Sequence, residues 1–125
     1  MLLDSDIFIW HLRGNVTANT LIKSIDSLYM SAITYMEVVR GIQDKEKLRK
    51  WKIFINNFGI KILMVDPEIS SKAMFLCDEY TLSHGLFVSD ALIVATAIIH
   101  EIPLVTGNVK DFQFIPNVTI KRFHA

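Results

Sequence analysis

The first residues of the chain place two acids inside an otherwise apolar segment. In MLLDSDIFIW, Asp4 and Asp6 follow three apolar residues and precede four more. A carboxylate is costly to bury unless it is paired or binds a metal. We therefore expect either a turn into solvent at this point or a site that uses these acids.

Two more acids stand in apolar segments farther along the chain. Glu37 lies in SAITYMEVVRGI and Asp90 lies in LFVSDALIVATAII. Each acid also has a purely structural explanation. Glu37 can pair with Arg40 on one face of a helix. Asp90 can occupy a first helical turn beside a Ser89 cap.

A polar cluster follows an apolar run near the C-terminus. In LVTGNVKDF, Thr106 and Asn108 come directly after the run, and Asp111 follows three residues later. A turn built from Gly107 and Asn108 would leave Asp111 in solvent. The alternative is that this segment joins the other acids.

Carboxylates that share one site repel each other, and a divalent cation relieves the repulsion. Mg²⁺ and Mn²⁺ both favour oxygen ligands. Such an ion lowers the pKa of a bound water and stabilises charge on a phosphate. The four His residues are not spaced as a zinc pair, and the single cysteine cannot form a thiolate site. Asp4, Glu37 and Asp90 together therefore indicate Mg²⁺ or Mn²⁺ chemistry.

Composition narrows the class of protein. The chain has 125 residues, 13 Lys and Arg against 13 Asp and Glu, and one cysteine. The length suits one domain, and the zero net charge is unlike that of a dedicated nucleic-acid coating protein. Because no disulfide can form and no signal peptide or bilayer-spanning run is evident, we expect a cytoplasmic protein. We expect Cys77 to be a buried core thiol.

Short apolar runs alternate with helical periodicity along the whole chain. We expect strands at the N-terminus and over residues 28–31, 61–65, 103–106 and 118–123. We expect helices over residues 7–14, 17–27, 32–42, 45–58, 67–83 and 90–101, with Ser31, Pro67 and Ser89 at helix starts. This order predicts an α/β sandwich with a mainly parallel sheet of about five short strands flanked by helices. Functional sites in such sheets form at the carboxyl ends of strands, where Asp4, Ser31, Asp66 and Thr106 fall.

Four segments taken together resemble a known family. LLDSDIFIW, SAITYMEVVRG, SDALIVATA and LVTGNVKDF occur in the order and spacing of the PIN-domain ribonucleases, specifically the VapC-type toxins of toxin–antitoxin pairs. The resemblance covers nearly the whole chain. It implies a single PIN domain over residues 1–125, a three-layer α/β fold, and an endoribonuclease that cuts RNA with water activated by Mg²⁺ or Mn²⁺.

The resemblance also implies roles for individual residues. Asp4, Glu37 and Asp90 match the catalytic acids, and Asp4 and Asp90 would bind the metal directly. Glu37 would bind metal or orient the attacking water. Asn108 stands where many relatives carry Asp, so Asp111 is the candidate for the last carboxylate ligand, and the number of metals stays open. The supporting polar residues are Asp6, Ser31, Thr106 and Asn108.

Partners follow from the same resemblance. It implies an RNA substrate and an antitoxin that blocks the site, in a homodimer or a toxin–antitoxin hetero-oligomer, with no membrane. The basic segment KEKLRKWK (45–52) is either a solvated helix face or an RNA grip. As RNA-binding residues we name Lys47 and Lys50 from this segment, and Arg13.

Two other function classes fit parts of the sequence. A PIN fold with a decayed site would be a protein-binding module, and Asn108 is the one sign of decay. The DSD motif also resembles that of haloacid-dehalogenase-type phosphatases, in which the first Asp is a nucleophile and the second a general acid. That mechanism needs a later acidic pair, and no paired acids follow a strand here in the expected way. A receiver domain fits the segments around Glu37 and Asp90 poorly.

Overall fold

Five short parallel strands form one sheet through the middle of the protein. The computed structural model describes all 125 residues. The strands run in the order β3-β2-β1-β4-β5, and every neighbouring pair is parallel. Their bounds are β1 (Leu2–Leu3), β2 (Tyr29–Ser31), β3 (Lys61–Leu63), β4 (Leu104–Thr106) and β5 (Ile120–Arg122). The predicted parallel α/β sheet is confirmed, with β3 and β5 shorter than expected.

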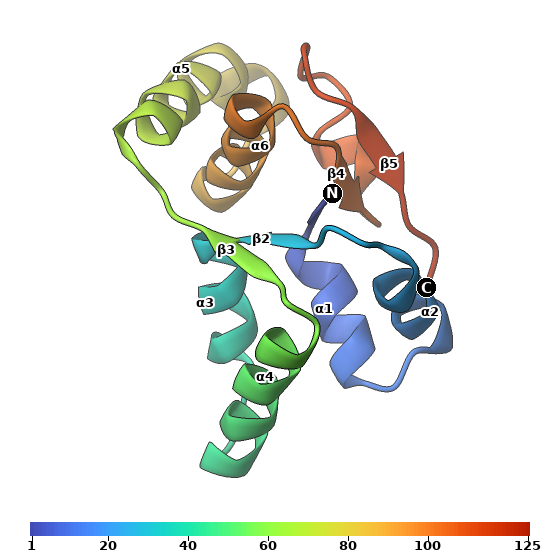
Figure 1. Ribbon diagram of the computed structural model, residues 1–125. Helices are drawn as coiled ribbons and strands as arrows, with labels where there is room; N and C mark the ends of the chain where they lie inside the picture. The colour runs from blue at the N-terminus through green and yellow to red at the C-terminus, as the bar shows by residue number, and fades with distance from the viewer.

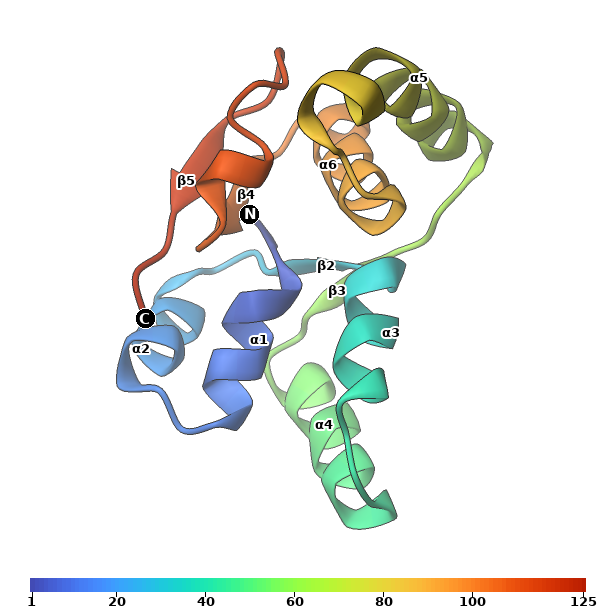
Figure 2. The same ribbon diagram turned by 180° about the vertical axis from the view of Figure 1, so that it is seen from behind.

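Helices connect the strands on both faces of the sheet. Figures 1 and 2 show α5 and α6 on one side and the first four helices on the other. None of the helices combines the length and apolar character needed to cross a membrane. Their bounds are α1 (Ser5–Leu12), α2 (Val16–Ser24), α3 (Ala32–Arg40), α4 (Lys45–Asn57), α5 (Pro67–His84) and α6 (Val88–His100), with a 3₁₀ turn η1 at Val109–Asp111.

Two hydrophobic clusters fill the spaces on either side of the sheet. Leu2 belongs to the cluster formed with α5 and α6, and Leu3 belongs to the cluster formed with the first four helices. Successive residues of a strand point to opposite faces, so one two-residue strand supplies both cores. The result is a three-layer sandwich, as the sequence resemblance implied.

Most predicted helix starts are confirmed. Ser31 caps α3 by accepting a hydrogen bond from the Ile33 N–H at 3.0 Å. Pro67 is the first residue of α5, where its missing N–H costs nothing. Asp66 is the cap of that helix and accepts from the Ile69 N–H at 2.8 Å. Its place after a strand is thus explained by capping.

Two predictions were wrong in detail. Ser89 is not the cap of α6, because the helix already begins at Val88 and the Phe87 carbonyl accepts the Ala91 N–H. The cap position is held by Phe87, which has no side-chain hydrogen bond to offer. Cys77 is only half-buried, because it lies on the border of the α5 face that packs on α6.

The core between the sheet and the first four helices contains one aromatic cluster. Trp51 of α4 is fully buried, packs edge-on against Phe8 of α1 at a centroid distance of 5.7 Å, and stacks on Phe54 at 5.7 Å. The indole Nε1 of Trp51 has no hydrogen-bond partner. The Trp51 side chain therefore contributes to stability through packing and not through a hydrogen bond.

This environment predicts different costs for two substitutions. Trp51→Ala should destabilise the fold by about 3–5 kcal/mol, because a large cavity replaces the indole. Trp51→Phe should cost clearly less, since the lost N–H makes no hydrogen bond. Urea denaturation followed by circular dichroism measures both. Equal losses for the two variants would contradict a contribution of Trp51 that comes mainly from packing.

Candidate functional site

Three neighbouring strands end at the same edge of the sheet and carry polar residues there. Asp4 follows β1, Ser31 is the last residue of β2, and Thr106 is the last residue of β4. The backbone N–H of Asp4 donates to the Val105 carbonyl at 2.9 Å. The sheet itself thus fixes the position of Asp4 relative to the end of β4.

Asp4 is the buried centre of this edge. Only 6% of its surface is exposed. One carboxylate oxygen accepts from the Ser5 N–H at 2.7 Å and the other accepts from the Thr106 Oγ1 at 2.8 Å. Thr106 Oγ1 in turn accepts from the Asn108 N–H at 3.0 Å. The Asp4 carboxyl group is therefore held in one orientation from two sides.

Asp6 is bound to the loop after β4. Its Oδ2 accepts from the Gly107 N–H at 2.8 Å, while its Oδ1 is buried and has no hydrogen-bond partner. A Cβ on Gly107 would stand 2.6 Å from Asp6 Oδ2. The close approach of this carboxylate therefore favours glycine at position 107, and Oδ1 of Asp6 is a buried oxygen without a partner.

Glu37 turns from α3 toward the start of α1. Its Oε1 accepts from the Ser5 Oγ at 2.5 Å, and Ser5 Oγ also lies 3.4 Å from Thr34 Oγ1. The alternative pairing of Glu37 with Arg40 is wrong, because the only ion pair in the protein joins Glu46 and Arg49.

Asp90 lies in the first turn of α6, close to two other acids. Burial, together with the negative charges of Asp111 and Glu37, raises its pKa to about 6. No hydrogen bond fixes the Asp90 or Asp111 side chain. Both carboxylates are therefore free to rotate toward a shared ligand.

Burial also dominates the electrostatics of Asp4 and Asp6. It raises the pKa of Asp4 to about 7, with added repulsion from Asp6 and Asp90, against hydrogen bonds from Thr106 and Ser5 that lower it. It raises the pKa of Asp6 as well, against the hydrogen bond from the Gly107 N–H. Raised pKa values in a group of acids mean that a cation would be bound favourably there.

The donor set suits a hard divalent cation. All the available donors are carboxylate oxygens, and the unpartnered Oδ1 of Asp6 is one of them. In the arrangement seen, no three acidic, His or Cys side chains converge closely enough to bind one ion. Binding of one ion by three of these acids therefore requires side chains to move, and the Asp90 and Asp111 side chains make no hydrogen bond that opposes such a movement.

The structure also separates the expected supporting residues. Thr106 and Asp6 make the contacts described above, but the hydroxyl of Ser31 is used in capping α3, and the Asn108 side chain is exposed without a hydrogen bond. Sequence reasoning missed Ser5 and Gly107 as contact residues. The signal for Ser5 was a small hydroxyl residue between two acids at a strand-to-helix turn.

The three basic residues named from the sequence lie around one cavity. Arg13 at the end of α1 and Lys47 and Lys50 on α4 line a cavity of about 550 Å³. Trp51, by contrast, is fully buried and is not available to a ligand. The cavity begins one helical turn beyond Asp6, since Ile9 forms part of its wall.

The raised pKa of Asp4 predicts a specific pH dependence of stability. In EDTA, the folded protein holds this proton to about pH 7, whereas the unfolded chain releases it near its ordinary pKa. Stability should therefore fall as pH rises between these values. Asp4→Asn should remove this fall. The free energy of unfolding of the variant, relative to that of wild type, should therefore rise from about pH 4 to pH 7 and stay constant at higher pH.

Urea midpoints measured across that range test this prediction. Asp78→Asn, on the exposed surface of α5, is the matched control and should shift the midpoint equally at every pH. A constant difference between Asp4→Asn and wild type across the range would contradict a raised pKa for Asp4.

Comparisons with known proteins agree with this architecture. Ribonuclease VapC10 of Mycobacterium tuberculosis is 29% identical over 116 residues, which cover 90% of this chain and 85% of the relative. Ribonuclease VapC of Rickettsia bellii is 28% identical over 132 residues, with 96% and 93% covered.

Solved structures give the same result. A chain in a toxin–antitoxin complex from Klebsiella pneumoniae is 30% identical, with a TM-score of 0.76 and 94% of each chain covered. A chain of VapBC2 from Rickettsia felis, bound to a DNA fragment from its promoter, is 22% identical with a TM-score of 0.82 and 98% of each chain covered, and shares the fold. The sequence pattern of the PIN domain matches residues 1–115, and the chain therefore belongs to the PIN domain family.

Proposed function

We propose that this protein is a metal-dependent endoribonuclease and the toxin of a toxin–antitoxin pair. The observation that carries the proposal is that acids from four segments lie near one sheet edge, where burial and the charges of neighbouring acids raise the pKa of Asp4 and of Asp90. The relatives named ribonuclease, each matched over most of its length, support this assignment.

Mg²⁺ or Mn²⁺ is the cofactor that these oxygen donors suit, and Asp4, Asp90 and Asp111 are the ligands that we propose. Asp111 is preferred to Asn108 because Asp111 carries a negative charge that acts on Asp90, whereas Asn108 has no charge to offer a cation. When bound, the metal acts as a Lewis acid that lowers the pKa of a water and offsets charge developing on a phosphate.

The residues of the chain supply orientation and proton transfer. The Ser5 N–H and Thr106 Oγ1 keep Asp4 in one orientation, which a metal ligand requires. Ser5 Oγ holds Oε1 of Glu37 and leaves Oε2 free. Glu37 Oε2 is the atom that we propose to accept the proton of the attacking water. The water oxygen bonds to phosphorus as the in-line bond to the leaving oxygen breaks, and the leaving oxygen takes a proton from solvent.

The proposed partner is an antitoxin that inhibits by placing a basic side chain among the acids. A basic side chain there would stabilise the charged form of the buried carboxylates whose pKa values are raised, as a metal would. The metal and the inhibitor would therefore compete for one set of charges. The 30% identity of this chain to a chain of the Klebsiella pneumoniae toxin–antitoxin complex supports an antitoxin partner.

Cleavage of total RNA by purified, antitoxin-free protein tests the function. With Mn²⁺ or Mg²⁺ we expect discrete fragments, and with EDTA none. Asp90→Asn should lower the cleavage rate by at least about a hundredfold while leaving the circular dichroism spectrum unchanged, because a charged ligand is lost without loss of volume. Asp78→Asn is the exposed control and should cleave like wild type. Equal cleavage by wild type and Asp90→Asn would remove Asp90 from the site.

The contact between Gly107 and Asp6 predicts a second effect. Gly107→Ala should push away the Asp6 carboxylate, because the new Cβ would stand 2.6 Å from its Oδ2. Mn²⁺ affinity by isothermal titration should fall by roughly ten- to a hundredfold, as for other residues that orient a ligand. Gly41→Ala, whose Cβ meets only the Val38 carbonyl at 3.6 Å, should leave Mn²⁺ affinity unchanged. Unaltered affinity in Gly107→Ala would show that Asp6 does not contribute to the metal site.

A further inference from the structure

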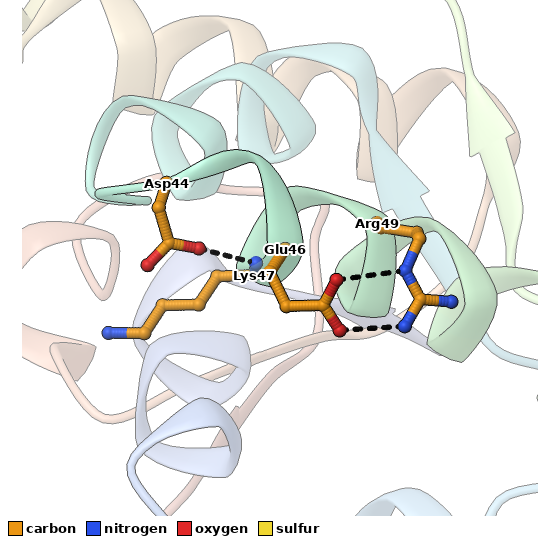
Figure 3. Close-up of polar contacts among 4 residues, drawn as sticks. All are labelled: Asp44, Glu46, Lys47 and Arg49. Atoms are coloured by element: carbon orange, nitrogen blue, oxygen red, sulfur yellow. Dashed lines mark hydrogen bonds and ion pairs between the residues drawn. The ribbon is translucent and has the colours of Figure 1, made fainter.

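The basic residues of α4 fall into two stripes with different surroundings. Lys47 and Lys50 are three residues apart and line the cavity beside α1, whereas Lys45, Arg49 and Lys52 follow another face of the helix. Arg49 is engaged by Glu46, with two hydrogen bonds of 2.6 and 3.1 Å. Figure 3 shows the Lys47 side chain extending away from that pair. Only one stripe therefore offers free charge to the cavity.

The cavity combines cations with an apolar wall. Arg13, Lys47 and Lys50 supply three positive charges, and no Asp or Glu is among the lining residues. Apolar residues, among them Ile9 and Val38, form nearly half of the lining. Such a surface suits a chain that presents phosphates and uncovered base faces together, which a single strand does and a duplex does not.

The cavity lies next to the acidic edge, because two helices carry residues of both. On α1, Ile9 follows Asp6 by one turn, and Arg13 stands about 10 Å from Asp6 along the helix axis. On α3, Val38 in the cavity wall directly follows Glu37. A strand whose phosphate lies at the acids would therefore reach the three cations within a few nucleotides.

We infer that this cavity between α1, α3 and α4 is the track for a single-stranded RNA segment next to the scissile phosphate. Lys47, Lys50 and Arg13 bind its phosphates, and the apolar wall contacts its bases. The other basic stripe of α4 is not part of the track. This inference rests on the proposed function for the identity of the strand, but its binding step needs no metal.

Binding of fluorescein-labelled oligouridine in EDTA, followed by anisotropy against salt, tests the inference. Lys47→Gln/Lys50→Gln should weaken binding roughly twentyfold at about 0.1 M salt and make the logarithmic salt slope shallower by about 1.4, the effect of two lost phosphate contacts. Lys45→Gln/Lys52→Gln removes the same charge from the same helix, outside the cavity, and should change neither value. A labelled RNA duplex should bind wild type more weakly than the single strand does.

Several outcomes would overturn the inference. Equal losses in the two double variants would mean that only the overall charge of α4 matters. No oligouridine binding by wild type would mean that the cavity has another occupant. Binding of an acidic amphipathic peptide that needs Lys47 and Lys50, without oligouridine binding, would identify a protein-docking groove.

A separate readout distinguishes failure of this inference from failure of the proposed function. Mn²⁺ affinity should be unchanged in Lys47→Gln/Lys50→Gln, because these residues lie away from the acids. If wild type cleaves RNA with metal but its oligouridine binding does not depend on Lys47 and Lys50, the track is overturned and the nuclease stands. Lysine-dependent binding without any metal-dependent cleavage would overturn the nuclease and leave the track.

Discussion

A buried carboxylate at the end of the central strand is the constraint on which the rest of the site depends. Asp4 ends β1, which has a neighbour on each side, and its two oxygens are held by the start of α1 and the end of β4. Burying this group costs free energy unless its charge is compensated, and its pKa rises accordingly. The fold retains an electrostatically unfavourable residue at the one place where neighbouring strand ends meet.

One residue, Ser5, orients both Asp4 and Glu37. Ser5 donates its backbone N–H to Asp4 and its hydroxyl to Glu37, so a single strand-to-helix turn orients acids from two separate α/β units. The Gly107 N–H holds Asp6 in the same way from the end of β4. These are short, direct contacts, and they make the relative placement of α1, α3 and β4 a condition of any chemistry at this edge.

Much of the fold could be predicted from the sequence, whereas the roles of the individual acids stay predictions. The alternation of short apolar runs and helical periodicity indicated the parallel sheet, because helices cover both faces and bury the strands β1 and β4 on both sides. Pro67 and Ser31 marked helix starts for local steric and hydrogen-bonding reasons. Ser89 failed as a marker because a cap depends on the backbone conformation at Phe87, which tertiary contacts decide. Likewise, the sequence marks Ser5 only as a hydroxyl residue between two acids, and nothing local pairs it with Glu37, which lies 32 positions away.

Helix α1 reconciles an acidic site with an anionic substrate. Its first turn holds Asp6 near the positive end of the helix dipole, and Arg13 caps its negative end. The helix dipole therefore favours the position of each charge, and the length of α1 keeps the Asp6 carboxylate apart from the Arg13 guanidinium. Since the whole chain is neutral, attraction of RNA must come from such separation rather than from an overall charge. The cations can then attract the strand at a distance from the acids, where they do not form ion pairs with the carboxylates that must remain free for a metal.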